Sequence, residues 1–195
     1  MYRFYLAAID LLPAILLLIP LYWILNRVYF HNAKTSFFYL VFSCYLAVVY
    51  VLVGLPNVTY IRPEVNLNLI PIIGIINDWK SSLLNILLFI PFGMMLPVLW
   101  KAFGRMYRTL LFGFTASLTI ELLQILTFRA TDVNDLITNT LGTALGFICV
   151  NNFHRSKQIS KETTSMDAVI VIAAVLLVMF FLYPFVSTAL WNFVL

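Results

Sequence analysis

Residues Glu121 to Phe147 read ELLQILTFRATDVNDLITNTLGTALGF, and they gather charged and amide side chains in a chain that is 63% hydrophobic and 10% charged. Soluble domains are about 45–50% apolar and about 25% charged. A small soluble domain also keeps too much of its surface in water to use so much apolar area. The chain is therefore predicted to be an all-α membrane protein, and this stretch is predicted to join two of its membrane helices.

Six apolar segments are candidates for transmembrane helices, each of about 20 residues. They are predicted at about 4–27, 36–55, 82–100, 106–127, 133–152 and 168–192. The fifth has the weakest apolar character, because its first turns hold several polar residues. The first segment is too long and too aromatic for a signal peptide, and it has no small-x-small cleavage site. The prediction is a polytopic transmembrane bundle of about six helices, forming a single domain over residues 1–195.

Basic side chains alternate between the predicted loops. The first, third and fifth loops hold eight of the twelve, namely Arg27, Lys34, Lys101, Arg105, Arg108, Arg155, Lys157 and Lys161. The positive-inside rule places these loops in the cytoplasm, so both termini and the polar stretch are predicted to face outward. Because the charges follow the loops, the net charge of +4 reflects topology and no nucleic-acid partner is expected.

The second loop, PNVTYIRPEVNLNLIPIIGIINDWKSS, is long for a compact helical bundle. It contains the apolar run LNLIPIIGII, which is too short to span a bilayer and is typical of a re-entrant or interfacial segment. Backbone of that kind is tolerated at membrane depth only inside protein or beside a wet cavity. The alternative is an ordinary surface loop that packs by its apolar side chains.

In the fourth predicted helix, Gly113, Ser117, Glu121 and Gln124 recur at helical spacing and share one face. A charged side chain at the bilayer centre costs roughly 2.5–3.5 kcal/mol or more, so such residues face the protein interior and usually have a partner. Glu121 is therefore a candidate catalytic acid or base. Its expected partner is Arg129 or a residue of the fifth helix. The alternative is a structural ion pair, or a protonated Glu121 hydrogen-bonded to Gln124.

In the fifth predicted helix, Asp132, Asp135, Asn139, Gly142 and Gly146 also share one face. The two glycines predict close packing against another helix. Asp132 could be the N-cap, with Asp135 completing a capping box. Asn139 lies one turn deeper, where capping does not explain it. It is a candidate site residue or a hydrogen-bonding contact between helices.

The third predicted helix contributes Asn85, followed by Pro91 and Gly93, which are expected to kink or loosen it. Both histidines lie in predicted cytoplasmic loops, away from the polar stretch. The carboxylates of the polar stretch could hold Mg²⁺, which prefers such oxygens, but their spacing is not specific for a metal. The cofactor is left unknown.

Three stretches together resemble the VanZ family of bacterial membrane proteins. They are VNLNLIPI (Val65–Ile72), NILLFIPFG (Asn85–Gly93) and the stretch that begins at Glu121. The likeness covers residues 36–150, and Ile72 stands where the family usually has Phe. The resemblance implies a place in the bacterial cytoplasmic membrane, with a role at its outer face. Some members of the family reduce susceptibility to teicoplanin and other lipoglycopeptides. The resemblance supplies no established reaction.

Three functions remain open. The first is an enzyme acting on a lipid or lipid-linked envelope precursor, with Glu121, Asp135 and Asp132 as catalytic residues. Its substrate-binding residues would be Arg129, Gln124, Asn139, Asn85 and Asn68. The second is a non-catalytic binder of a lipid headgroup or an amphiphilic antibiotic. The third is a transporter or scaffold whose polar residues form a packing network. The sequence leaves the oligomeric state open.

Overall fold

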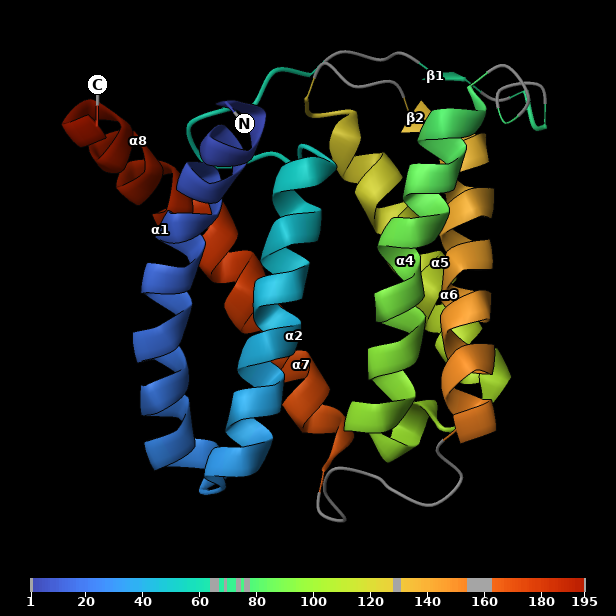
Figure 1. Ribbon diagram of the computed structural model, residues 1–195, viewed down its shortest axis with the longest axis horizontal. Coiled ribbons are helices and arrows are strands. Elements are labelled where there is room, and N and C mark those ends of the chain that lie inside the picture. Colours follow the sequence, from blue (N-terminus) through green and yellow to red (C-terminus); the bar gives the residue numbers. More distant parts are fainter. Residues whose placement is uncertain are drawn as a thin grey trace. The chain divides into compact units, whose positions relative to one another are not determined.

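The computed structural model describes residues 2–63, 67–68, 70–72, 75, 78–127, 131–153 and 163–194. Figure 1 shows the helices, whose bounds are α1 (Tyr2–Leu25), α2 (Ala33–Leu52), α4 (Trp79–Leu99), α5 (Met106–Gln124), α6 (Val133–Phe153), α7 (Ser165–Leu177) and α8 (Tyr183–Val194). A π-helical turn, η3 (Val178–Leu182), carries α7 into α8. The long helical segments match the six predicted ones, and the all-α prediction is confirmed.

Five helical segments of the described chain are long and apolar enough to cross a membrane, namely Leu11–Phe30, Ala33–Leu52, Trp79–Leu99, Val133–Val150 and Ser165–Phe193. The helix α5 is not among them, so the least apolar of the six segments is α5 and not α6. Thr115 and Thr119 contribute to its polarity. Each donates its hydroxyl to a backbone carbonyl of the preceding turn, which satisfies these hydroxyls inside the helix.

The chain forms two compact units. Unit 1 comprises Met1–Ile61 together with Met166–Leu195, and unit 2 is the continuous segment Arg62–Ser165. Whether the two make the single domain expected over residues 1–195 stays a prediction. The predicted site residues all belong to unit 2.

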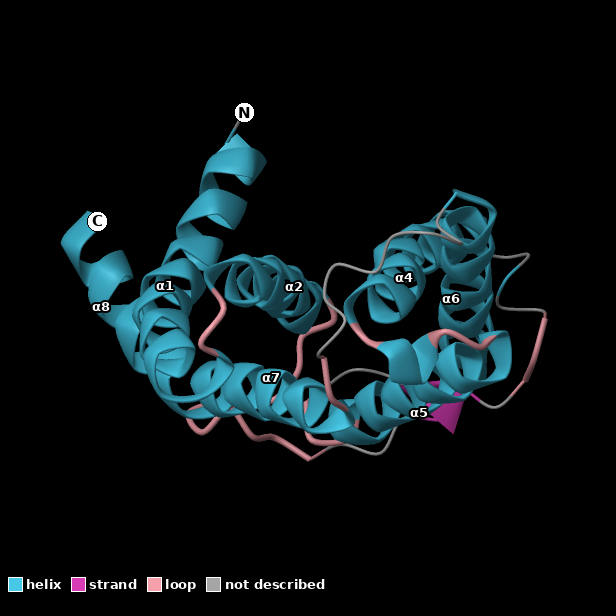
Figure 2. Ribbon diagram, turned by 90° about the horizontal axis from the view of Figure 1, so that it is seen from below, coloured by secondary structure: helices cyan, strands magenta, loops and turns pink. Residues whose placement is uncertain are grey.

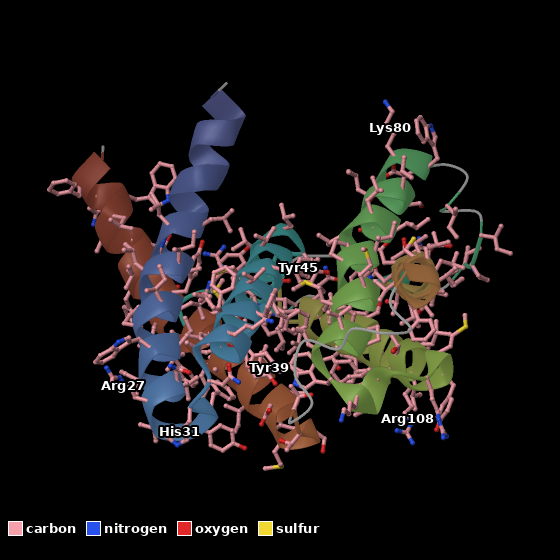
Figure 3. All side chains as sticks on the ribbon, turned by 60° about the horizontal axis from the view of Figure 1, so that its bottom comes forward. Arg27, His31, Tyr39, Tyr45, Lys80 and Arg108 are labelled. Atoms are coloured by element: carbon pink, nitrogen blue, oxygen red, sulfur yellow. The ribbon has the colours of Figure 1, made fainter. Side chains whose placement is uncertain are left out.

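Unit 1 contains α1, α2, α7 and α8, together with the turn η1 (Asn26–Phe30). Tyr39 of α2, labelled in Figure 3, donates its hydroxyl to Oδ2 of the buried Asp167 at 3.0 Å, which joins α2 to the first turns of α7. Tyr22 and Ser43 share a hydrogen bond of 2.5 Å between their hydroxyls. In a membrane, hydrophobic burial gives helices little reason to associate, because the lipid tails are also apolar. Buried polar pairs of this kind help to hold the helices together instead.

Unit 2 is built on close packing between α4 and α6, which run in the same direction (Figure 1). A methyl group added at Gly142 or Gly146 of α6 would collide with the backbone carbonyl oxygen of Ile86 or Ile90 of α4. A methyl group at Gly93 of α4 would collide with the backbone of α6 in the same way. The predicted small-residue contact is therefore confirmed, and its partner is α4.

The helix α5 lies across α4 and α6, as Figure 2 shows. Its Gly113 leaves room for the side chain of Thr143 of α6, which is fully buried. Thr143 donates its hydroxyl to the Asn139 carbonyl at 2.9 Å. The helix α4 continues through Pro91 and Pro97 without interruption. Gly93 lies against the backbone of Thr143 of α6, and the predicted kink or loosening of this helix stays a prediction.

Candidate functional site

The polar residues of unit 2 gather where α5 ends and α4 and α6 begin (Figure 1). We call this region the polar end and define it by Asn68, Glu121, Asp132, Asn134 and Asp135. The basic residues of the α4–α5 turn lie at the opposite end of unit 2, where Figure 3 labels Arg108, whereas Lys80 marks the polar end. Among the described residues of unit 2, the acidic side chains lie at or near the polar end, and the opposite end has basic side chains without acidic ones.

The second loop pairs with the α5–α6 linker at the polar end. The strands β1 (Leu67–Asn68) and β2 (Thr131–Asp132) are parallel, with Leu67 opposite Thr131 and Asn68 opposite Asp132. Further along, the Arg62 N–H donates to the Leu126 carbonyl at 2.9 Å. Two stretches of the predicted motif pattern are thereby brought together. The predicted re-entrant segment, residues 67–76, is described only in part, and its place in the membrane stays a prediction.

Glu121 ties the end of α5 to the start of α6. Its side chain is 3% exposed, and its Oε2 atom accepts the backbone N–H of Asp132 at 2.8 Å. Thr131 donates its hydroxyl to the Glu121 carbonyl at 3.0 Å. The structure thus places a partner for Glu121 just before α6, whereas the other expected partner, Arg129, lies outside the described residues. The partner before α6 is the backbone N–H of Asp132, which has no acceptor within a helix. The Glu121 carboxylate supplies the missing acceptor.

Asp132 is the N-cap of α6, as the capping alternative predicted. Its Oδ1 atom accepts the backbone N–H of Asn134 at 2.8 Å, and its Oδ2 atom accepts from the Asn68 side chain at 3.0 Å. One carboxylate therefore caps a helix and anchors the second loop. A capping box would direct the Asp132 N–H to Asp135. In this protein Glu121 accepts that N–H.

Asn134 is a site residue that the sequence did not single out. It is 2% exposed, its Oδ1 atom accepts the Ile72 N–H at 2.7 Å, and its Nδ2 atom donates to the Ile70 carbonyl at 3.1 Å. Ile72 has φ 72°, a left-handed conformation that is an outlier for a β-branched residue. The bond from Asn134 holds this turn. The sequence did offer one indication of this role, namely that Asn134 is a polar residue between Asp132 and Asp135.

Asn139 and Ser117 form a second polar layer, one helical turn deeper. The Asn139 side chain is 4% exposed, and its Nδ2 atom donates to the hydroxyl of the fully buried Ser117 at 2.9 Å. Its Oδ1 atom is buried and accepts no hydrogen bond from the described chain. The contact joins α5 to α6, which supports the predicted alternative of a hydrogen bond between helices. Gln124 is also buried, at the end of the same face of α5.

The remaining predicted site residues have different positions. Asp135 is half-buried in the first turn of α6. Asn85 is half-buried on α4, beside Ile86, whose carbonyl faces Gly142. Arg129 lies outside the described residues, so its predicted role in substrate binding stays a prediction.

The arrangement of the acids bears on the Mg²⁺ hypothesis. Within the described ranges, no three His, Cys, Asp or Glu side chains are placed so that they could hold a metal ion. Glu121 and Asp132 instead direct oxygens toward N–H groups of the protein. The Mg²⁺ hypothesis stays a prediction, and these two carboxylates have partners within the protein.

The fold and the polar end define a class: a multi-pass membrane protein with a polar site at one end of a tightly packed helical unit. A family model described as VanZ/LLP1 matches residues 37–155, close to the predicted limits of 36–150. A curated relative, Protein VanZ of Enterococcus faecium, is 34% identical over 120 residues, which cover 60% of this chain and 70% of the relative. No solved structure matches the chain. The chain belongs to the VanZ family.

Proposed function

We propose that the chain binds a lipid or lipid-linked envelope component at the outer face of the bacterial cytoplasmic membrane and thereby lowers susceptibility to lipoglycopeptides such as teicoplanin. Membership of the VanZ family supports this role. The observation that carries it is the polar end itself. Asn68, Glu121 and Asp132 come from separate parts of the family-like sequence and are joined there by hydrogen bonds.

The surroundings of the polar end suit an amphiphilic ligand. Leu122 follows Glu121 and is 56% exposed, and Leu84 precedes Asn85 and is 65% exposed. In a membrane, such side chains contact acyl chains. A ligand with a polar headgroup and acyl chains could therefore contact polar and apolar groups of unit 2 at the same time, as is usual for binding sites.

The charge of the opposite end supports the outward orientation. Lys101, Arg105 and Arg108 are exposed at the basic end, which the positive-inside rule assigns to the cytoplasm. In a variant without Cys44 and Cys149, we expect Ser81→Cys to react with a membrane-impermeant maleimide added to whole cells. Gly104→Cys is expected to react only after lysis. The reverse labelling pattern would contradict the proposed orientation.

The geometry favours binding over turnover. Glu121 and Asp132 each commit a carboxylate oxygen to a backbone N–H, which gives them a positioning role. Asp135, the third predicted catalytic acid, is half-buried in the first turn of α6 at the same polar end, and it is our candidate for direct contact with the ligand. Lipid analysis of cells with and without the chain tests this point. An unchanged set of lipid species is expected, and a new or missing species would show an enzyme.

Asp135→Asn is the decisive variant, because it removes a charge while keeping the size and polarity of the side chain. We expect cells that produce it to lose the teicoplanin resistance conferred by the wild-type chain, at an unchanged protein level on an immunoblot. Thr119→Val is the control, since Thr119 is exposed on α5 and its hydroxyl donates to the Thr115 carbonyl of the same helix. Unchanged resistance in Asp135→Asn would contradict the proposal.

A further inference from the structure

The turn between α4 and α5 is a concentrated basic surface. It contains the short helix η2 (Lys101–Phe103), and Lys101, Arg105 and Arg108 are all exposed. The sequence has no acidic residue between Asp78 and Glu121. The surface therefore carries cations without neighbouring acids from the same segment. It lies at the end of unit 2 opposite the polar end, so it is independent of the proposed function (Figure 3).

Tyr107 holds one of the two arginines of this turn. The Arg108 Nε atom donates to the Tyr107 hydroxyl at 3.0 Å, and the Arg108 guanidinium carbon lies 5.7 Å from the centre of the Tyr107 ring. Arg105 lies two residues before Tyr107 and is also exposed. Two guanidinium groups, one of them held by the tyrosine, are therefore exposed within one short segment.

The backbone that presents these side chains is well fixed. Arg108 donates from Nη1 to the Ala102 carbonyl at 3.3 Å, and the buried Thr109 donates its hydroxyl to the Phe103 carbonyl at 2.7 Å. The Gly104 N–H donates to the Lys101 carbonyl at 3.1 Å. A ligand therefore meets a turn that is already ordered, which lowers the entropic cost of binding.

Apolar side chains lie next to the cations. Met106, Tyr107 and Leu111 in the first two turns of α5 are exposed. Amphipathic and aromatic side chains beside basic ones are typical of the membrane–water interface. A soluble phosphate would use the cations and leave these apolar groups in water, whereas a phospholipid would contact both.

We propose that Arg105 and Arg108, the latter held by Tyr107, bind the phosphate of an anionic phospholipid at this turn. Guanidinium groups bind phosphate through paired, charge-assisted hydrogen bonds. Basic segments beside a membrane are attracted by anionic lipids. The arginines could also be explained as a topology signal alone. The positive-inside rule requires only positive charge, which lysine also supplies, whereas headgroup binding requires the paired N–H donors of arginine.

Native mass spectrometry of the purified full chain in detergent tests the site, with dioleoyl phosphatidylglycerol and dioleoyl phosphatidylcholine as probes. We expect the wild-type chain to bind phosphatidylglycerol more tightly than phosphatidylcholine. Arg105→Gln with Arg108→Gln is expected to weaken phosphatidylglycerol binding by about tenfold or more, from the loss of charge-assisted hydrogen bonds. Lys80→Gln, which removes an exposed cation at the polar end, is expected to leave it unchanged.

Arg105→Lys with Arg108→Lys keeps the charge and hence the topology signal. It is expected to fold, to insert correctly and to bind phosphatidylglycerol more weakly than the wild type, because lysine lacks the paired donors. Tyr107→Phe is expected to weaken binding in the same direction. These two variants decide the matter if the glutamine variant does not fold. Equal binding of the two lipids, unchanged binding by the lysine variant, or displacement of the lipid by inorganic phosphate would overturn the proposal.

Discussion

Glu121 accepts the backbone N–H of Asp132 through its Oε2 atom, so a side chain of α5 bonds the backbone donor that immediately precedes α6. The N-terminus of a helix has backbone N–H groups without helical partners and carries partial positive charge. A carboxylate from a neighbouring helix stabilises both features.

The Glu121–Asp132 contact predicts different effects of two substitutions at Glu121. Glu121→Ala leaves the partly buried Asp132 N–H without its acceptor and is expected to cost about 1–3 kcal/mol of stability. Glu121→Gln retains an acceptor oxygen and is expected to cost less. Denaturant unfolding in detergent micelles measures both. Equal losses of stability would show that the contact does not contribute through its hydrogen bond.

Asn134 is expected to control the order of the second loop. Asn134→Ala removes the acceptor of the Ile72 N–H and the donor to the Ile70 carbonyl. Hydrogen exchange of the Ile72 amide is therefore expected to accelerate, while α4 and α6 keep their protection. Thr140→Ala is the control, because the Thr140 hydroxyl donates only to a carbonyl of its own helix. Unchanged exchange at Ile72 would contradict this role.

Ser117 and Asn139 are expected to be energetically coupled. Ser117→Ala removes the acceptor of the Asn139 Nδ2 atom and leaves a buried amide further unsatisfied, at about 1–3 kcal/mol. Adding Asn139→Leu removes the polar group altogether, so the double variant is expected to be more stable than Ser117→Ala alone. A double-mutant cycle of thermal stability measures this coupling. Additive effects would argue against the bond.

Gly146 is expected to tolerate no larger residue. Gly146→Val places side-chain atoms against the Ile90 carbonyl of α4, and overpacking of this kind typically costs about 1–3 kcal/mol or more. Loss of folded protein, measured by size-exclusion chromatography in detergent, is the expected result. Gly104→Ala is the control, because Gly104 lies in an exposed turn with more space. Normal elution of Gly146→Val would show that α4 and α6 can separate.

Composition and helical spacing predicted the helices because a membrane helix is a long apolar segment with an unmistakable length. Their ends were less accurate. The third predicted helix was expected from residue 82, whereas α4 begins at Trp79 because the Asp78 side chain accepts the Ser81 N–H. A helix cap depends on a single polar side chain, and a hydropathy average over many residues does not show where that cap lies. The same limitation explains why the predicted sixth helix began after Asp167.

The sequence predicted those residues of the candidate site that recur at helical spacing within one helix. Glu121 and Asn139 were singled out by their depth, and both are buried and bonded across the α5–α6 contact. The pairing of Asn68 with Asp132 was not predicted, because strands of two residues have no periodic pattern. The role of Asn134 depends on that pairing, so the sequence did not reveal it either.

Unit 1 is interrupted in the sequence by the whole of unit 2. The family match begins at residue 37 and ends at 155, so it includes most of α2 and excludes α1, α7 and α8. A fragment cut at those limits would keep Tyr39 and lose Asp167, its hydrogen-bond partner. The segment 37–155 that matches the family is therefore a poor choice for expression as a separate fragment. Arg62–Ser165 is the better choice for expression as a separate fragment.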